Sequence, residues 1–350
     1  MKTVKLGTAY INTTPLDWSG NIALIEKAIS DAKKDSQKLI CLPELTITGY
    51  GCEDLFFSND LTERAWSNLE KISKTTKDIV VFVGLPVRYI NNLYNCVACL
   101  ADGKILGIVP KKFLANDGVH YEMRWFKPWP SKVVVDYNGI PLGDIFFSFD
   151  SVRVGVEICE DAWVPDRPSG ELSKKGIDII VNPSASHFSF GKAKARRRYA
   201  QESSRANGCA YILSNISGCE AGKIIYDGHT LIASNGEIIA EGELLSLKSV
   251  SGISSVVDLD SQRLRQAIRG SGNPEIEEKE ERCIESNFSL IEKSGIPGTV
   301  KKLKDISEYE EFSKAASLGL FDYLRKSKSK GYVISLSGGA DSSAVTVLSY

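Results

Sequence analysis

The stretch from Asp150 to Val164, DSVRVGVEICEDAWV, is the sequence feature that most constrains the fold. Apolar and polar residues alternate up to Cys159, which predicts a strand with one polar side. The alternation stops at Glu160, where we expect the chain to turn. An α/β protein can mount a nucleophile at the carboxyl end of a buried strand, whereas an isolated cysteine is more often a core thiol. The stretch therefore predicts a strand that ends in either a nucleophile or a core thiol.

The rest of the first 265 residues alternates strand, helix and strand. Short β-branched or apolar runs predict strands at 3–11, 38–41, 78–83, 177–181 and 209–214. Apolar residues at helical spacing predict helices near 22–32 and 61–72, and a basic helix over 193–205. Turn residues at 101–103 and 234–236 predict two hairpins. This pattern predicts a layered α/β domain with its polar groups at the carboxyl ends of strands.

The composition excludes several classes of protein. The 350 residues are enough for about two domains. The formal net charge of -1 gives no reason to expect nucleic acid or an anionic membrane as a partner. The N-terminus, MKTVKLGTAYINTT, lacks the apolar region of a signal peptide, and no apolar run is long enough to span a bilayer. We therefore expect a cytoplasmic protein.

The cysteines and histidines give only weak signals. The eight cysteines are scattered through a long chain without a secretion signal, so we expect no disulfide framework. Cys96 and Cys99 form a single CxxC inside an apolar run, which favours core thiols over zinc ligands. The three histidines, His120, His187 and His229, are far apart in the sequence. No metal site is predicted within this chain.

The chain changes character after Gly270. The acidic, poorly periodic SGNPEIEEKEERCIE is followed by GIPGTV, which predicts a linker or connecting arm over 266–302. A helix near 312–324 and a strand over 331–336 are predicted next. One helix, one strand and the start of another helix do not make a domain. We therefore expect residues 303–350 to begin a second, truncated domain.

SGGADSS, residues 337–343, is the most specific local pattern. Glycines allow a ligand to approach the backbone, and the N–H groups at a helix N-terminus bind phosphate. The pattern lacks the GK[ST] of a Walker A loop, but it resembles the PP-loop of ATP pyrophosphatases. The alternative is a Ser/Gly turn that caps a helix. The resemblance implies a doubly wound α/β fold in which the ATP pyrophosphate is held by Ser337, Gly338, Gly339, Asp341, Ser342 and Ser343.

Three further motifs do not identify a function when each is considered alone, but their order along the chain does suggest a family. PELTITGY places Glu44 after a predicted strand, K-x-x-L followed by E-x-R-x-F contains Lys111, and GVEICEDAW contains Cys159. Together they resemble the nitrilase superfamily. The resemblance implies a four-layer α-β-β-α sandwich in which these three residues are catalytic. Glu122 falls where the superfamily often has a second glutamate close to the lysine.

Further motifs resemble one particular group of proteins within this superfamily. KKFLANDGVHYEMRWFKPW, SASHFSFGKAKARR and YDGHTLI look like the glutaminase domain of glutamine-dependent NAD synthetases. The resemblance implies that 1–265 is a nitrilase-type glutaminase (amidase) domain and that 303–350 begins the ATP-binding synthetase domain. It implies L-glutamine, ATP, Mg²⁺ and deamido-NAD as ligands, and a homo-oligomer. Ser186 and Lys192 are implied to bind glutamine, although some relatives have arginine in place of Lys192 and a tyrosine in place of Asp117.

The implied chemistry is thiol-catalysed hydrolysis of an amide. Cys159 attacks the side-chain amide carbon of glutamine, and Glu44 takes the thiol proton and returns it to the leaving ammonia. Lys111 stabilises the oxyanion and favours the thiolate. Water then hydrolyses the thioester, so no histidine is required. The ammonia passes to the synthetase domain, which amidates deamido-NAD with release of AMP and pyrophosphate.

Two other functions are compatible with parts of this pattern. A stand-alone nitrilase-family carbon–nitrogen hydrolase would leave SGGADSS without a purpose. A non-catalytic nitrilase-like binding or scaffold module would be expected to have lost at least one of Glu44, Lys111 and Cys159, and all three are present. The motifs therefore favour the glutaminase.

Overall fold

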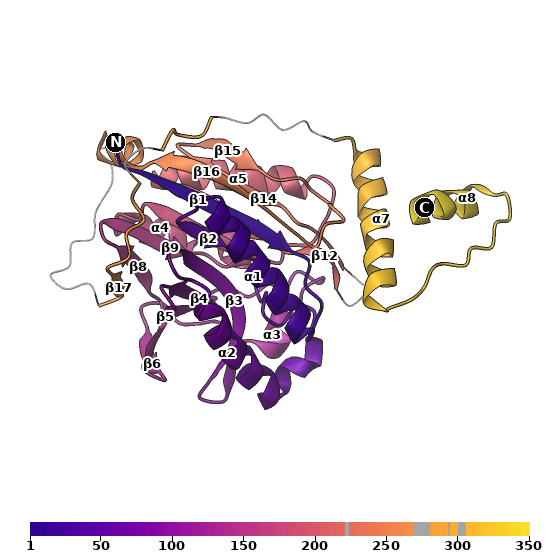
Figure 1. Cartoon of the computed structure of the whole chain (residues 1–350), viewed down its shortest axis with the longest axis horizontal. Coiled ribbons are helices and arrows are strands. Elements are labelled where there is room, and N and C mark those ends of the chain that lie inside the picture. The colour runs from indigo at the N-terminus through magenta and orange to yellow at the C-terminus, as the bar shows by residue number, and fades with distance from the viewer. Residues whose placement is uncertain (221–223, 269–280, 293–294, 300–305) are drawn as a thin grey trace.

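Two β-sheets packed face to face form the body of the protein (Figure 1). The computed structural model describes residues 1–220, 224–268, 281–292, 295–299 and 306–350. Within these residues the first sheet has the strand order β16-β1-β2-β3-β4-β5-β7-β6. Its strands are β1 Thr3–Ile11, β2 Leu39–Cys41, β3 Val80–Tyr89, β4 Asn92–Ala101, β5 Lys104–Pro110, β6 Val134–Tyr137, β7 Ile140–Gly143 and β16 Val250–Asp258.

The second sheet has the order β15-β14-β11-β10-β9-β8-β17. Its strands are β8 Phe146–Phe149, β9 Val152–Val156, β10 Ile179–Ser184, β11 Ala210–Asn215, β14 Thr230–Ser234, β15 Glu237–Glu241 and β17 Cys283–Ser286. Strands β9, β10 and β11 run parallel, so their carboxyl ends meet at one edge of the sandwich. A separate short hairpin pairs β12 Ser217–Glu220 with β13 Ile224–Asp227.

The described residues form eight helices and two 3-10 turns, and some of the helices cover the outer faces of the two sheets. Their bounds are α1 Trp18–Lys34, α2 Asn59–Ser73, α3 Glu122–Trp125, α4 Pro168–Lys174, α5 Lys192–Asn207, α6 Leu259–Ile268, α7 Glu308–Lys326 and α8 Ala340–Ser349, with 3-10 turns η1 Glu53–Phe57 and η2 Cys159–Ala162. Asp17 caps α1 by accepting a hydrogen bond from the Gly20 N–H at 3.0 Å.

Three apolar layers hold these elements together. Side chains such as Phe82 and Phe147 fill the space between the two sheets. Ile25 of α1 packs with Val81 on the outer face of the first sheet, and Ala200 of α5 packs with the outer face of the second. Each fully buried aliphatic or aromatic side chain contributes about 1.5–3 kcal/mol. The layers confirm the predicted α-β-β-α sandwich.

The two predicted hairpins are present, and residues that readily adopt positive φ angles form both of their turns. Asp102-Gly103 connects β4 to β5, and Asn235-Gly236 connects β14 to β15. All four residues have positive φ angles, from 46° to 86°. A two-residue turn with both residues at positive φ matches the twist of antiparallel strands, and Asp-Gly and Asn-Gly adopt it readily. Cys96 and Cys99 lie on β4 in different core layers, as expected for core thiols.

The region after residue 265 differs from the prediction in two places. Cys283–Ser286 lies within the predicted connecting arm, but it forms β17 and extends the second sheet beside β8. The strand predicted over 331–336 was wrong, because these residues form no strand. Val333 and Leu336 are exposed, and a strand needs a neighbour to satisfy its backbone hydrogen bonds. Residues 269–280, 293–294 and 300–305 of the predicted arm and second domain lie outside the described residues.

Helix α7 lies against the edge of the sandwich, and α8 lies beyond it (Figure 1). Ala315 and Leu318 of α7 pack with Leu245. None of the described helices combines the length and the apolar composition needed to cross a bilayer. The expected cytoplasmic location stays a prediction.

Candidate active site

Glu44 is placed by the chain that leaves β2. Its side chain is buried, and the next residue, Leu45, has a φ of 48°. Gly84 of β3 permits this path, because a Cβ atom there would lie 2.2 Å from the Leu45 nitrogen. The turn therefore holds the Glu44 carboxylate inside the protein, at the carboxyl end of the strand where the sequence predicted it.

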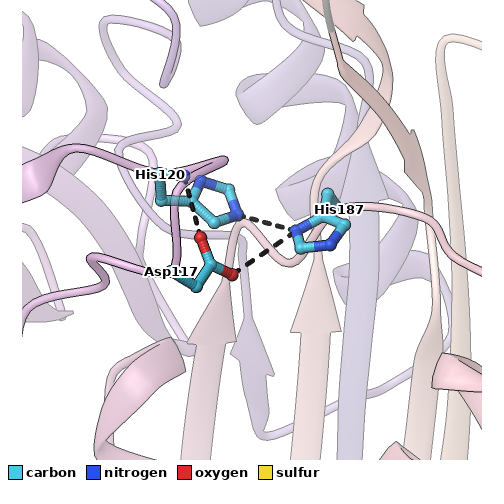
Figure 2. Close-up of side chains that lie close together, drawn as sticks. All are labelled: Asp117, His120 and His187. Atoms are coloured by element: carbon cyan, nitrogen blue, oxygen red, sulfur yellow. Dashed lines mark hydrogen bonds and ion pairs between the residues drawn. The ribbon is translucent and has the colours of Figure 1, made fainter.

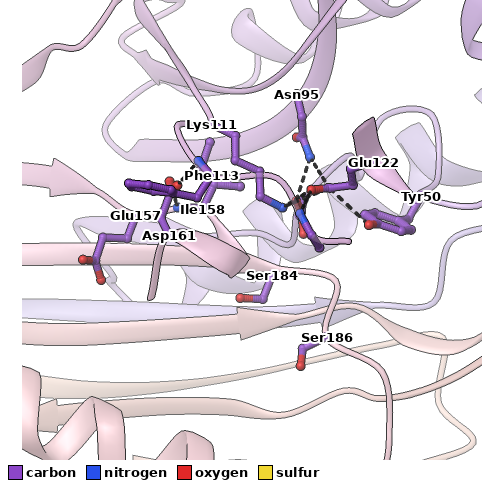
Figure 3. Close-up of polar contacts among 12 residues, drawn as sticks. Tyr50, Asn95, Lys111, Phe113, Glu122, Glu157, Ile158, Asp161, Ser184 and Ser186 are labelled. Carbon is purple, nitrogen blue, oxygen red and sulfur yellow. Dashed lines mark hydrogen bonds and ion pairs between the residues drawn. The ribbon is translucent and has the colours of Figure 1, made fainter. Parts of the chain in front are cut away.

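Lys111 follows β5 and lies between two carboxylates. Its Nζ is 2.7 Å from Oε1 of Glu44 and 2.7 Å from Oε2 of Glu122, and all three side chains are buried. The Asn95 amide donates to Oε1 of Glu44 at 2.7 Å and to Oε1 of Glu122 at 3.0 Å. The Tyr50 hydroxyl also donates to Glu122, at 3.1 Å. Figure 3 shows Lys111, Asn95 and Tyr50 converging on Glu122.

The two carboxylates have different surroundings. Glu122 Oε2 accepts a further hydrogen bond from the Ala115 N–H at 2.7 Å. Glu44 Oε2 is buried without a hydrogen-bond partner among the described residues. A buried acceptor without a partner is costly and calls for an explanation, such as a catalytic role. Glu122 is thus arranged as the permanent counter-ion of Lys111, and Glu44 as a carboxylate with one oxygen available.

The electrostatics agree with this division. Burial and the nearby Glu122 charge raise the pKa of Glu44 to about 7, despite the opposing effect of Lys111. Burial would also raise the pKa of Glu122, but Lys111 outweighs it and lowers that pKa. The carboxylates likewise outweigh the effect of burial on Lys111, whose pKa is well above its usual value. A carboxyl group with a pKa near 7 can act as a base or an acid at neutral pH.

Cys159 lies just after β9, at the first position of η2. Its φ is 45°, an uncommon conformation for a residue with a side chain and one that occurs often at functional sites. Burial and the Glu44 charge raise the pKa of the Cys159 thiol, although Lys111 and a backbone hydrogen bond with Ala185 oppose them. The resting thiol is therefore protonated. Lys111 lowers the pKa of Cys159 but burial outweighs it, and the expectation that Lys111 favours the thiolate during the reaction stays a prediction.

Asp161 joins the cysteine turn to the lysine loop. Its Oδ2 accepts from the Ile158 N–H at 2.9 Å, and its Oδ1 accepts from the N–H groups of Lys112 at 3.2 Å and Phe113 at 2.8 Å. Burial raises the pKa of Asp161 to about 7. Figure 3 shows Asp161 between Ile158 and Phe113. One side chain thus fixes the two segments that carry Cys159 and Lys111.

Ser186 and Lys192 both follow β10 in the sequence, in the connection that leads into α5. Asn215 holds the Ser186 backbone with two hydrogen bonds, of 2.8 and 2.9 Å. The Ser186 hydroxyl is buried and has no partner among the described residues. Lys192 begins α5 and lies 5.8 Å from the centre of the Trp163 ring, within the cysteine segment. Nζ of Lys192 also lies 3.1 Å from both ring nitrogens of His187, so of the two side chains only that of Ser186 has no partner among the described residues.

Two histidines that are 67 residues apart in the sequence meet in the structure. Nε2 of His120 lies 3.0 Å from Nδ1 of His187. Asp117 lies beside them, with its Oδ2 4.0 Å from the same Nδ1 (Figure 2). The separation of these histidines in the sequence gave no indication of this contact. The pKa values of both are lowered, chiefly by burial, and that of His120 falls to about 4.

SGGADSS forms a loop and the first turn of α8. Gly338 has a φ of 82°, and Gly339 precedes the helix. The Ser337 and Ser342 hydroxyls lie 3.1 Å apart, and Ser343 donates to the Gly339 carbonyl at 2.8 Å. The segment is exposed. The structure thus brings the predicted ATP-binding residues together, outside the sandwich that carries Glu44, Lys111 and Cys159.

Sequence reasoning missed several residues of the site. They are Tyr50, Asn95, Asp161 and Asn215, all of them buried. Tyr50 and Asp161 lie within the PELTITGY and GVEICEDAW motifs, but the motifs do not show which groups these side chains contact, and Asn95 and Asn215 belong to no motif. The nearest signal was the polar residue within an otherwise apolar strand, as with Asn95 in β4. A buried amide or carboxylate needs partners, so such positions are worth marking in a sequence.

Comparison with known proteins agrees with this architecture. The carbon-nitrogen hydrolase family model matches residues 5–269. The glutamine-dependent NAD(+) synthetase of Bos taurus is 34% identical over 369 residues, a match that covers 99% of this chain and 52% of the relative. The chain therefore spans about half the length of the curated relatives it matches.

Solved structures show the same similarity. The crystal structure of a glutamine-dependent NAD(+) synthetase from Cytophaga hutchinsonii is 38% identical and has a TM-score of 0.80, over 99% of this chain and 51% of that chain. The synthetase from Acinetobacter baumannii, solved in complex with ADP, is 23% identical with a TM-score of 0.79, over 99% and 57% of the two chains. The relatives at 34% and 38% identity confirm the resemblance inferred from the motifs, and the Acinetobacter structure shows the same fold.

Proposed function

The chain belongs to the carbon-nitrogen hydrolase family, and we propose that its sandwich hydrolyses the side-chain amide of L-glutamine with Cys159 as nucleophile. The observation that carries the proposal is the buried contact of Lys111 with Glu44, whose second carboxylate oxygen lacks a partner among the described residues. The similarity to synthetases named for glutamine dependence supports glutamine as the amide.

The first step transfers a proton and forms a bond. Cys159 is a thiol at rest, so Glu44 takes its proton as the sulfur attacks the amide carbon. Negative charge develops on the amide oxygen, and the Lys111 ammonium together with the Glu160 backbone N–H would stabilise it. Glu44 then gives its proton to the leaving nitrogen, and ammonia departs from a γ-glutamyl thioester.

The second step releases glutamate. Water attacks the thioester carbon, with Glu44 again as the base, and the sulfur leaves with a proton as the thiol. Glu122 keeps Lys111 charged and positioned through both steps. The Ser186 hydroxyl, which has no partner in the part of the chain that the structure describes, and the ammonium of Lys192 are suited to the polar end of glutamine, which carries an α-amino and an α-carboxylate group. Lys192 would contact the carboxylate as a point charge, without the bidentate geometry of arginine.

The ammonia is proposed to serve an ATP-dependent amidation of deamido-NAD. Relatives named NAD(+) synthetases that match 99% of this chain support this role. Ser337, Ser342, Ser343 and the backbone N–H groups at the start of α8 would hold the ATP pyrophosphate, next to two glycines that leave room for it. Mg²⁺ would neutralise phosphate charge when bound, with Asp341 as the carboxylate of this segment. Assembly as a homo-oligomer is part of the same proposal.

The test measures glutamate and ammonia release from L-glutamine by this chain and by Cys159→Ala. Turnover that disappears in Cys159→Ala supports the proposal, and turnover that persists contradicts it. If the chain alone is silent, the reaction is repeated on a longer protein that contains a whole synthetase domain, with ATP and deamido-NAD. Silence there as well would overturn the glutaminase assignment. A substitution of core Cys99 by alanine is the matched control, and we expect it to retain turnover.

A further inference from the structure

We propose that Asp117, His120 and His187 form a binding site for a borderline divalent transition-metal ion such as Zn²⁺ or Co²⁺ beside the active site. One ligand atom from each residue lies within 4.8 Å of the other two. Figure 2 shows the two ring nitrogens and the carboxylate turned toward one another. The site itself needs no assumption about the reaction of Cys159.

The distances suit a small ion. Zn²⁺ binds histidine nitrogen and carboxylate oxygen at about 2.0–2.2 Å, so two of its tetrahedral ligands lie about 3.3 Å apart. The two ring nitrogens are 3.0 Å apart, and the carboxylate oxygen is 4.0 Å from the His187 nitrogen. Small side-chain rotations would bring all three to these distances. Two nitrogens and one oxygen favour Zn²⁺ or Co²⁺ over Mg²⁺ and Ca²⁺, which prefer oxygen ligands.

Two of the ligands are held by their surroundings. Asp117 Oδ1 accepts from the N–H groups of Val119 at 3.1 Å and His120 at 2.9 Å, which fixes the carboxylate and leaves Oδ2 beside His187. The His120 ring packs edge-on against Tyr50, with ring centres 5.5 Å apart. Binding therefore requires little ordering of the Asp117 and His120 side chains.

The site is connected to the glutamine pocket through Lys192. Its Nζ lies 3.1 Å from both ring nitrogens of His187, so a divalent ion on Nδ1 would repel this ammonium. Lys192 would then move away, for instance toward Trp163, which it already approaches. This consequence rests on the proposed function, in which Lys192 binds the carboxylate of glutamine. Metal and glutamine are therefore expected to weaken each other's binding.

The test measures Co²⁺ binding by calorimetry and by the visible absorption of the bound ion. All variants carry Cys159→Ala, so that the catalytic thiol does not contribute and turnover is not needed. We expect one Co²⁺ per chain. Loss of one direct ligand in His187→Asn or Asp117→Asn should weaken binding at least about tenfold. Asp166→Asn, an exposed carboxylate outside the cluster, is the matched control and should bind as the parent does.

The outcomes separate the possibilities. If His187→Asn and Asp117→Asn bind Co²⁺ as tightly as the Cys159→Ala parent, the proposed site is wrong. If the unmodified chain binds Co²⁺ and Cys159→Ala does not, the ion belongs to the thiol, and the proposed site is again wrong. Circular dichroism of each variant checks that it is folded, and Asp117→Asn should disturb the fold least because the Asp117 side chain is partly exposed. Saturating glutamine should raise the Co²⁺ dissociation constant of Cys159→Ala. An unchanged constant would overturn the link to Lys192 while the glutaminase assignment stands on its own test.

Discussion

The ammonium of Lys111 lies 2.7 Å from the carboxylate of Glu44, and neither side chain is exposed to solvent. Two charges in such a place are costly unless they compensate each other. Glu122 adds a second carboxylate to the same ammonium, so the group as a whole carries one excess negative charge when all three are ionised. That excess favours protonation of one carboxylate, and the surroundings direct the proton to Glu44.

The pH dependence of glutamine hydrolysis should therefore report Glu44. It accepts the thiol proton only when ionised, so kcat/KM should rise with pH and level off above a midpoint near 7. One pH unit below the midpoint the rate should be about tenfold lower than the plateau. Glu122→Gln removes a charge that raises the pKa of Glu44, so its midpoint should lie at lower pH.

Initial-rate measurements over pH 5 to 9 test whether kcat/KM rises with pH as predicted. Glu63→Gln, an exposed residue of α2, is the matched control and should leave the profile where it is. A profile that falls with increasing pH through this range would contradict the role of Glu44 as base. Glu44→Gln should remove the dependence together with most of the activity, by a factor of about 10² to 10⁴.

Removal of Lys111 should lower both stability and activity, and the two losses should have different causes. Lys111→Met leaves two buried carboxylates without their cation, which should lower the free energy of unfolding by about 3–5 kcal/mol. The double variant Lys111→Met with Glu122→Gln removes one of these charges and should regain part of that stability. Neither variant should hydrolyse glutamine, because the oxyanion loses its cation.

Urea unfolding and glutamine hydrolysis, measured on the same preparations, check both parts. Lys112→Met provides the comparison, since Lys112 neighbours Lys111 and pairs with Asp144 at 2.8 Å. It should lose stability but keep hydrolysis. A double variant no more stable than Lys111→Met would show that carboxylate repulsion is not the cause of the loss.

The sequence predicted what depends on local pattern. Strand alternation located the sheets, and the turn residues at 101–103 located a hairpin, although Ala101 itself pairs with Lys104 and the turn contains only Asp102 and Gly103. The resemblance to the nitrilase superfamily singled out Glu44, Lys111 and Cys159, and each of them follows a strand in the structure. The hydrogen bond between Asn95 and Glu44 joins residues that are 51 positions apart, and no local pattern records which distant side chains the fold brings together. The same reason hid the contact between His120 and His187.

The strand predicted over 331–336 failed for a different physical reason. Its apolar residues favour a strand, but a strand is stable only beside another strand that accepts its hydrogen bonds. Among the described residues, no strand lies beside it, and Val333 is exposed. The sandwich strands were predictable because their partners are present in the same stretch of chain.

Asp161 should matter to catalysis through position alone. Asp161→Ala leaves the buried N–H groups of Ile158 and Phe113 without their acceptor, at about 1–3 kcal/mol for each group left unsatisfied. The segments that carry Cys159 and Lys111 then lose their direct link. We expect lower kcat, and slower reaction of Cys159 with a glutamine-like electrophile.

Electrophile labelling followed by mass spectrometry measures that rate, and urea unfolding measures the loss of stability. Asp161→Asn keeps one carbonyl oxygen as an acceptor and should fall between the parent and Asp161→Ala in both measurements. Asp136→Asn is the control, because Asp136 lies on the short strand β6 and outside the segments that carry Cys159 and Lys111. It should leave the labelling rate as in the parent. A labelling rate in Asp161→Ala equal to that of the parent would contradict the positioning role.

Asp322 fastens α7 to the sandwich. This buried carboxylate accepts from the Asn12 amide at 2.9 Å and from the Cys219 N–H at 2.7 Å, and Lys326 Nζ lies 3.4 Å away. Asp322→Asn removes the charge and turns one acceptor into a donor. The helix should then exchange its amide hydrogens faster, while strands such as β1 stay protected.

Hydrogen exchange with mass spectrometry measures both in one experiment, and Glu310→Gln on the exposed side of α7 is the matched control. Equal exchange of α7 in the two variants would show that apolar packing of Leu318, rather than Asp322, holds the helix in place.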